Sequence, residues 1–138
     1  MSDVSGIDVL RDWIAESRSA VFFGGAGVST GSGIPDFRGE DGLYRQQWDY
    51  PLEEILGISL FHQDPAHYYR YFRATHMAAA QPNVTHRRLA ELEDEGHMRA
   101  VITQNIDGLH QKAGSSVVHE LHGSLYHFYC ARCRRDYG

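Results

Sequence analysis

Residues Ala20–Gly39 read AVFFGGAGVSTGSGIPDFRG, and this stretch decides the fold class. Its first four residues have strand character and lead directly into a run rich in glycine, which ends in the rigid turn Ile34–Gly39. In α/β proteins, an apolar strand that enters a glycine cluster brings bare backbone amides against a phosphate group. Glycine suits such a loop because a Cβ atom would block the close approach or forbid a positive φ angle. The stretch therefore predicts a nucleotide or dinucleotide site in an α/β protein.

The two best-known glycine patterns fit this loop poorly. After Gly25 and Gly27 the third glycine is Gly31, one residue later than G-x-G-x-x-G requires, and no Gly-Lys-Ser/Thr follows for a P-loop. An ordinary glycine-rich surface turn is the alternative for the glycines alone. The tail Asp36–Arg38 favours a binding site, because an aromatic ring beside a guanidinium can stack on a flat ring and pair with an anionic oxygen.

Length and composition indicate one globular domain. The 138 residues are 42% hydrophobic and 22% charged, which is ordinary for a globular protein. The net charge of -5 argues against a nucleic-acid surface, so the basic cluster Arg132, Arg134 and Arg135 is expected to be a solvated face. No apolar run approaches the length that spans a membrane, and the N-terminus lacks a secretory signal. We therefore expect a cytoplasmic protein that binds neither nucleic acid nor membrane.

The apolar pattern predicts alternating helices and strands. An amphipathic helix around Leu10–Ser17 precedes the first strand, and Asp64-Pro65 reads as the start of an aromatic-rich helix. The sequence predicts helices over 66–79, 83–95 and 107–113. It also predicts strands over 100–103 and 117–118. The alternation of strand, crossover helix and strand predicts a doubly wound parallel sheet.

Polar residues follow the second predicted strand, as the glycine cluster follows the first. In parallel α/β sheets, ligands bind beyond the carboxyl ends of the strands. Gln104, Asn105 and Asp107 lie at such an end and are suited to holding ribose hydroxyls and an amide. The alternative for Asp107 is that it simply caps the next helix. Both roles are compatible.

His122 is the candidate general base. It follows the predicted strand 117–118 within Glu120-Leu121-His122-Gly123, again at a strand end. Histidine titrates near neutral pH, so it can accept a proton from a hydroxyl group. His119 lies three residues earlier, which makes a metal-binding pair a competing hypothesis, although a helical context and a third ligand are missing.

Cys130 and Cys133 form a C-x-x-C pair. Such a pair supplies two of the four ligands of a tetrahedral zinc site. A thioredoxin-like redox motif is the alternative, but that motif opens a helix after a strand. Here the pair follows Leu125–Tyr129, which alternates like a strand that enters a zinc ribbon. Without an export signal, a metal or redox role in a reducing cytoplasm is favoured over a structural disulfide.

Two motifs resemble those of the sirtuins, a family of NAD-dependent protein lysine deacylases. Residues 25–38 match the family signature GAG-x-S-x-x-x-G-I-P-x-F-R, and residues 103–107 match its T-Q-N-I-D, followed by the family's H-x-x-A-G at 110–114. The resemblance implies that NAD is bound by Gly25, Ala26, Gly27, Ser29, Thr30, Ile34, Asp36, Phe37, Arg38, Gln104, Asn105, Ile106, Asp107 and His122.

The resemblance also implies a reaction. An acetyl group passes from a protein lysine to ADP-ribose, and nicotinamide and O-acetyl-ADP-ribose are released. His122 would act as the general base, Asn105 would contact the nicotinamide ribose, and Asp107 would contact the nicotinamide amide. Residues 67–73 lack the Tyr-x-x-Arg pair of desuccinylase-type members, which favours plain acetyl-lysine. The alternatives are mono-ADP-ribosyl transfer to protein and a non-catalytic fragment that binds NAD or zinc.

The same resemblance implies a domain layout. Residues 1–124 would be the first half of a Rossmann-like NAD-binding domain, with a cofactor loop and helical module at 40–82, and residues 125–138 would begin a zinc ribbon. In the family a second cysteine pair follows about twenty residues further on. Cys130 and Cys133 would then be two of four ligands of a structural zinc. We therefore expect a domain that is truncated at its C-terminus and weak or inactive alone.

Overall fold

The computed structural model describes residues 5–74 and 77–137, which fall into two compact units. The first unit joins the chain up to Gly25 with the chain from Pro82 onward, and the second is Ala26–Gln81. The first contains the sheet, and the second is built from short helices. The predicted boundary between an NAD-binding part up to residue 124 and a zinc-binding part from residue 125 stays a prediction.

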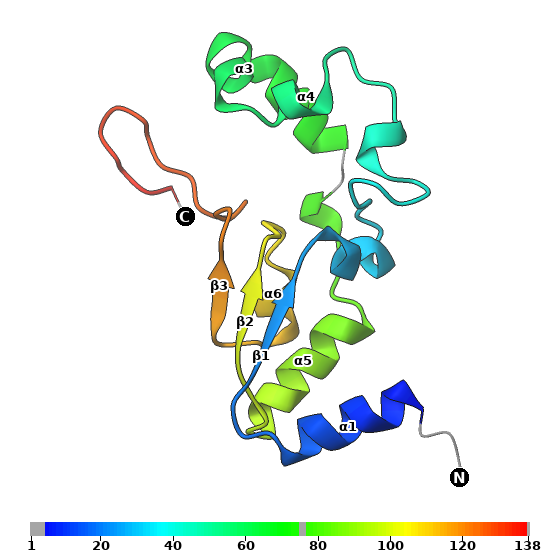
Figure 1. The fold of residues 1–138 in the computed structure, drawn as a ribbon. Helices are drawn as coiled ribbons and strands as arrows, with labels where there is room; N and C mark the ends of the chain where they lie inside the picture. The colour runs from blue at the N-terminus through cyan, green and yellow to red at the C-terminus, as the bar shows by residue number, and fades with distance from the viewer. Residues whose placement is uncertain (1–4, 75–76, 138) are drawn as a thin grey trace. The chain divides into compact units, whose positions relative to one another are not determined.

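The first unit is built on a three-stranded parallel sheet with the order β1-β2-β3. Its strands are β1 at Ala20–Gly24, β2 at Met98–Thr103 and β3 at Val118–Glu120. All three arrows run in the same direction in Figure 1. Gly24 pairs with Thr103, and Thr103 pairs with Glu120, so the three strands end in one row. The predicted parallel sheet is confirmed, although its third strand begins at Val118 and continues to Glu120.

Helices α1 at Gly6–Glu16 and α5 at Val84–Asp94 contribute to the core of this unit. Leu89 and Leu92 of α5 pack with Met98 and Val101 of β2, and this cluster is completed by the half-buried residues Ile14, Phe22 and Val118. The two faces of the sheet differ. Side chains alternate along β1, so Phe22 faces the core while Val21 and Phe23 are 52% and 62% exposed. The core therefore lies on one face of the sheet.

Local sequence explains where α5 begins and ends. The side chain of Asn83 accepts hydrogen bonds from the backbone N–H groups of Thr85 and His86, and the Nδ1 atom of His86 accepts one from the Asn83 N–H in return. This reciprocal capping box satisfies donors that the first turn leaves unpaired. At the other end Gly96 adopts a φ of 80°. Glycine tolerates this angle, but a helix cannot continue through it, so the helix ends there. The predicted limits of this helix are confirmed.

The short helix α6 at Leu109–Ala113 starts later than predicted. The sequence predicts a helix from Asp107, but Gly108 has a φ of 65° and thus lies in the left-handed region. Asp107 and Gly108 therefore form a turn in front of the helix. Gly114, with a φ of 113°, ends the helix as predicted.

The second unit has its own small core. Its segments are the 3-10 helices at Ala26–Ser32, Leu43–Arg45 and Met77–Ala79 and the helices α2 at Leu52–Ile55, α3 at Ile58–Gln63 and α4 at Pro65–Ala74. Leu43, Leu52, Ile55, Leu60 and Tyr71 are buried together, with Trp48 packed against them. The aromatic-rich helix predicted over 66–79 ends at Ala74, and residues 75 and 76 of that prediction lie outside the described residues.

The start of α4 is the one expected from Asp64-Pro65. The Asp64 carboxylate accepts a hydrogen bond from the N–H of His67 at 2.9 Å, and proline at the first helical position loses no helical hydrogen bond. None of the helices in residues 5–74 and 77–137 is long and apolar enough to cross a bilayer.

The end of the chain is a short hairpin. Tyr129 and Asp136 form an antiparallel bridge, the N–H of Cys130 donates to the carbonyl of Arg135 at 2.9 Å, and Tyr137 donates to Phe128 at 2.7 Å. The predicted strand over Leu125–Tyr129 is wrong, because only Phe128 and Tyr129 at its end bond across the hairpin. The N–H of Leu125 instead donates to the carbonyl of Ile106, and that of Tyr126 donates to the hydroxyl of Ser124. These local bonds use the backbone groups that a strand would need.

Candidate functional site

Three chain segments leave the sheet of the first unit at one edge. The row Gly24, Thr103 and Glu120 marks that edge. Immediately beyond it, the N–H of Gln104 donates to the carbonyl of Gly24 at 3.0 Å, and that of Leu121 donates to the carbonyl of Thr103 at 2.9 Å. The sheet thus gathers Gly25, residues 104–107 and residues 121–123 at the carboxyl ends of its strands. This is the region where ligands bind in such sheets.

Asn105 is held by backbone and side-chain contacts. Its side-chain amide donates to the carbonyl of Gly25 at 3.2 Å, and its backbone N–H donates to the hydroxyl of Thr103 at 3.0 Å. Gly25 also has little room for a side chain, since a Cβ atom there would lie 3.0 Å from Oε1 of Gln104. Glycine at this position therefore lets the segment after β1 and the segment after β2 lie close together.

Asp107 shapes the turn that leads into α6. Asp107 is buried, with 4% of the residue exposed, and its Oδ1 accepts a hydrogen bond from the N–H of Leu109 at 3.0 Å. The cap-like role considered for Asp107 is thus present. Gly108 is required in this turn, because a Cβ atom would add strain at a φ of 65° and lie 2.6 Å from Cε2 of Tyr126. The Tyr126 ring therefore covers the turn.

Two buried histidines, which the sequence does not single out, lie next to Asp107. His86 of α5 is 0% exposed and His110 of α6 is 1% exposed, and their ring centroids are 4.7 Å apart. Burial lowers the pKa of His110 to about 4, with a further lowering by His86 and an opposing effect of the Asp107 charge. Burial also lowers the pKa of His86, again opposed by Asp107. The helical spacing of His86 with Leu89 and Leu92 was the signal that could have predicted its burial.

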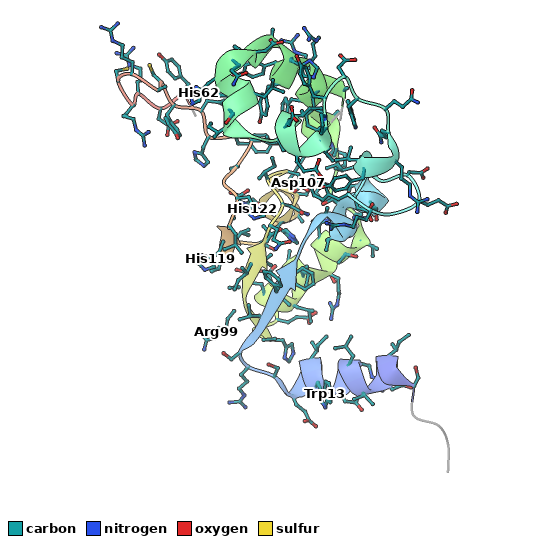
Figure 2. The ribbon with its side chains drawn as sticks, turned by 45° about the horizontal axis from the view of Figure 1, so that its top comes forward. Trp13, His62, Arg99, Asp107, His119 and His122 are labelled. Carbon is teal, nitrogen blue, oxygen red and sulfur yellow. The ribbon has the colours of Figure 1, made fainter. Side chains whose placement is uncertain are left out.

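His122 is exposed at the end of β3. It precedes Gly123, whose φ is 82° and whose N–H donates to the carbonyl of Glu120 at 3.3 Å, so a tight turn presents the imidazole. Figure 2 shows Asp107 and His122 toward the carboxyl ends of the strands, whereas His119 lies further back along β3. His119 and His122 gain no metal partner, since no group of three or more possible ligands occurs among the residues that the structure describes.

The glycine segment of the second unit is a 3-10 helix rather than an irregular loop. Ser29 is buried in it, and the hydroxyl of Thr30 donates to the carbonyl of Gly27 at 2.9 Å. A Cβ atom on Gly27 would lie within 4 Å of no heavy atom of the described chain, when the neighbouring residues and the backbone of the same helix are left out. Packing within the chain thus gives no reason for glycine at this position, which leaves open space at the backbone.

The tail of the glycine segment forms a stiff turn beside a cavity. Oδ1 of Asp36 accepts a hydrogen bond from the N–H of Gly39 at 2.6 Å, and Phe37 and Arg38 both approach the ring of Tyr44, at 6.2 and 5.5 Å. Tyr44 is a neighbour that sequence reasoning did not identify. A cavity of about 340 Å³ adjoins this turn and is lined by Thr30, Gly33, Ile34, Pro35, Asp36, Gly39, Glu40 and Asp41. Three of the predicted cofactor residues, Thr30, Ile34 and Asp36, therefore line one cavity.

Cys130 and Cys133 lie in the turn of the C-terminal hairpin, and both thiols are free. The N–H of Arg134 donates to the carbonyl of Cys130 at 2.9 Å, and Arg134 itself has a φ of 61°. Hydrogen bonds from the backbone N–H groups of Cys133 and Arg132 lower the pKa of the Cys130 thiol. Thiolate is the form that binds a metal ion, so the turn is suited to a metal ligand. Within residues 5–74 and 77–137 it supplies two ligands and no third.

Comparison with known proteins identifies the family. A family model described as the Sir2 family matches residues 25–138. The chain belongs to the Sir2 family. This confirms the resemblance to sirtuins, and the Sir2 match includes every predicted cofactor and metal residue.

Curated Sir2 relatives are similar over almost the whole chain. The NAD-dependent protein deacetylase of Cutibacterium acnes is 52% identical over 130 residues, which cover 91% of this chain and 53% of that protein. That of Clostridium acetobutylicum is 46% identical over 134 residues, which cover 95% of this chain and 55% of that protein. The chain thus spans about half the length of the curated relatives it matches.

Solved Sir2 structures have the same fold over this length. A Sir2 structure with a deacetylated p53 peptide and 3'-O-acetyl ADP ribose has a TM-score of 0.85 at 43% identity, over 96% of this chain and 53% of that one. A Sir2 structure with a p53 peptide and NAD+ has a TM-score of 0.81 at 44% identity, over 96% and 52%. The α/β fold with a parallel sheet and helices is therefore confirmed as Sir2-like.

Proposed function

We propose that the protein is an NAD-dependent protein lysine deacetylase, which transfers an acetyl group from lysine to ADP-ribose and releases nicotinamide. The observation that carries this proposal is the row of strand ends, which gathers Gly25, Asn105, Asp107 and His122 at one edge of the sheet. Relatives with the name NAD-dependent protein deacetylase, at 46% and 52% identity, support the same activity.

The residues present fit NAD. Gly27 has open space where a Cβ atom would be, and the cavity beside Asp36 is lined by Thr30 and Ile34. Glycine amides without side chains can lie against a diphosphate, since nothing blocks their approach. The proposed NAD-binding residues are Gly25, Ala26, Gly27, Ser29, Thr30, Ile34, Asp36, Phe37, Arg38, Gln104, Asn105, Ile106, Asp107 and His122. When bound, NAD would supply the ribose carbon that accepts the acetyl oxygen and the nicotinamide that leaves.

The chain's own residues would orient the reacting groups and move one proton. Asn105, fixed by its bonds to Gly25 and Thr103, would hold the ribose. The Asp107 carboxylate would accept a hydrogen bond from the nicotinamide amide. The ring of Phe37, which is 38% exposed, would cover the reacting carbon against water. The exposed imidazole of His122 would take the proton from a ribose hydroxyl.

The proposed substrate is an acetylated lysine in a protein. Similar Sir2 structures were solved with an acetylated peptide and with a p53 peptide, which supports a peptide substrate. Helix α4 carries His67–Arg73 without the Tyr-x-x-Arg spacing of desuccinylase-type sirtuins. Plain acetyl-lysine is therefore the proposed acyl form.

We propose in addition that Cys130 and Cys133 are two of four ligands of a structural zinc, at the start of a zinc ribbon. The lowered pKa of Cys130 and the two free thiols in one turn support this role. Zinc at this site would fix the hairpin rather than take part in the chemistry. Free thiols also suit a reducing compartment, and the cytoplasm is the proposed location.

The experiment compares His122→Ala with His119→Ala in the full-length protein. Both histidines are exposed and three residues apart, but only His122 is a proposed base. We expect His122→Ala to lower the rate of nicotinamide release from NAD and an acetyl-lysine peptide by about 100-fold or more, and His119→Ala to leave it within about twofold. Undiminished deacetylation by His122→Ala would remove this residue from the reaction. Mass spectrometry that finds ADP-ribosylated protein instead of O-acetyl-ADP-ribose would favour ADP-ribosyl transfer, and NAD binding without turnover would favour a non-catalytic protein.

A further inference from the structure

The buried pair His86 and His110 has no role in the proposed chemistry. The ring centroids of His86 in α5 and His110 in α6 lie 4.7 Å apart, and that of Phe22 in β1 lies 6.0 Å from that of His110. Nε2 of His86 and both ring nitrogens of His110 have no hydrogen-bond partner among the described residues. Buried polar atoms are almost always paired, because leaving them unpaired costs free energy. Two such rings in a core call for a reason other than packing.

The pair is linked to Asp107 through the start of α6. Asp107 binds the N–H of Leu109, and His110 is the next residue, so carboxylate and ring belong to one short segment. Two charged groups, Asp107 and Arg87, act on the pair, and its two members also act on each other. The Asp107 charge favours a proton on either ring, while the Arg87 charge opposes one on His86, and a charged His86 opposes one on His110.

We propose that His86 and His110 form a proton-dependent positioning pair for Asp107, which sets how strongly this carboxylate binds the nicotinamide amide. This rests on the proposed function, in which that amide contacts Asp107. With a neutral pair, the full charge of the carboxylate acts on the ligand. A proton on the pair places a cation beside the carboxylate within the protein interior, where the attraction between opposite charges is strong. The carboxylate is then drawn toward the pair and binds the amide less well.

One proton suffices for this effect. Burial opposes charge on both rings, and a charge on His86 lowers the pKa of His110 further, so the pair takes up one proton before a second. Proton and ligand then compete through Asp107. By linkage, protonation weakens NAD binding by the same factor by which NAD binding weakens protonation. His86 and His110 are thus positioning residues, because they act through Asp107 and not on the ligand.

The experiment measures the pH dependence of NAD binding by the full-length protein between pH 7.5 and pH 4.5. We compare the wild type with the double variant His86→Gln/His110→Phe, which keeps a capping acceptor at 86 and a ring at 110 but cannot be protonated at either. We expect NAD affinity to fall at least threefold more in the wild type than in the double variant over this range. His122 is unchanged in both proteins, so it does not contribute to the difference. The variant His119→Gln, changed at an exposed histidine of β3, is expected to follow the wild type.

A second measurement protects the test against a double variant that fails to fold. The ring signals of His86 and His110 are followed by NMR in the wild type, with and without NAD. We expect NAD to lower the apparent pKa of the pair by about half a unit, which corresponds to a threefold effect. An unshifted titration, or identical pH profiles in the wild type and a folded double variant, overturns the proposal. Wild-type protein that does not bind NAD at pH 7.5 overturns the proposed function instead.

Discussion

The imidazole rings of His86 and His110 lie 4.7 Å apart, centroid to centroid, with an angle of 57° between their planes. One ring belongs to α5 and the other to α6, the short helix that follows Asp107. Both rings are buried, so neither can form a hydrogen bond with water at the surface. This relationship makes the stability of the first unit dependent on pH.

His110 is expected to destabilise the fold in acid. Burial lowers its pKa from 6.5 to about 4, so below pH 6.5 the unfolded chain takes up a proton that the folded chain does not. Stability is therefore complete above about pH 6.5 and is lost as the pH falls toward 4, by about 3 kcal/mol from this residue. Urea unfolding at pH 7 and pH 4.5 should show a smaller pH effect in His110→Phe than in the wild type. The exposed control His119→Gln should retain the full effect, and an unchanged pH effect in His110→Phe would contradict the prediction.

Glu93 is expected to hold the start of β3. Its carboxylate accepts hydrogen bonds from the hydroxyl and N–H of Ser116 and from the N–H of Val117, the N–H distances being 3.0 to 3.2 Å. Replacement by alanine removes these bonds at an exposed site, where water can bind the donors instead, and we expect Glu93→Ala to lower the free energy of unfolding by about 0.5–1.5 kcal/mol. Glu91→Ala, which removes an exposed ion pair with Arg88, should cost at most about 1 kcal/mol.

The contribution of Glu93 should also depend on pH. The hydrogen bond from the Ser116 side chain, followed by the backbone bonds, lowers the pKa of Glu93. A carboxylate with a lowered pKa stabilises the fold above its unfolded pKa, and this stabilisation is lost as the pH falls through the folded value. The difference in stability between the wild type and Glu93→Ala should thus shrink in acid. A constant difference from pH 7 to pH 3 would refute the role of the charge.

Gly108 and Gly96 allow strain and crowding to be measured separately. Both have positive φ angles, but a Cβ on Gly96 would meet nothing within 4 Å, whereas one on Gly108 would lie 2.6 Å from the Tyr126 ring. We expect Gly96→Ala to cost about 1–2 kcal/mol of unfolding free energy, from backbone strain alone. Gly108→Ala should cost more. In a Tyr126→Ala background the cost of Gly108→Ala should fall to that of Gly96→Ala. Denaturant unfolding of the three single variants and of the double variant Gly108→Ala/Tyr126→Ala tests this.

Zinc binding should depend on Cys130. Metal analysis of the full-length protein is expected to find zinc in the wild type and to find most of it lost in Cys130→Ser, since structural zinc is bound through thiolates. Loss of zinc should also lower the thermal midpoint, because metal binding contributes to folding. Arg132→Ser changes the same turn, keeps its backbone donor and should retain the metal. Full zinc content in Cys130→Ser would exclude this cysteine as a ligand.

The sequence by itself determined the family and the outline of the first unit. The apolar runs at Ala20 and Ala100 became parallel neighbours, and the limits of α5 followed from Asn83 and Gly96, because capping and glycine conformation are local properties. The motifs at 25–38 and 103–107 were sufficient for the Sir2 assignment.

Only the tertiary structure decided which of these residues share surroundings. The pairing of Gly24, Thr103 and Glu120 in one row gathers their neighbours. This depends on the register of β1 against β2, which lie about eighty residues apart in the sequence, and of β2 against β3. The failure of 125–129 as a strand has the same cause, since a strand needs a partner and Leu125 bonds to Ile106 instead. Helical spacing predicts that His86 is buried, but its contact with His110 arises from packing between two helices, which a local pattern does not contain.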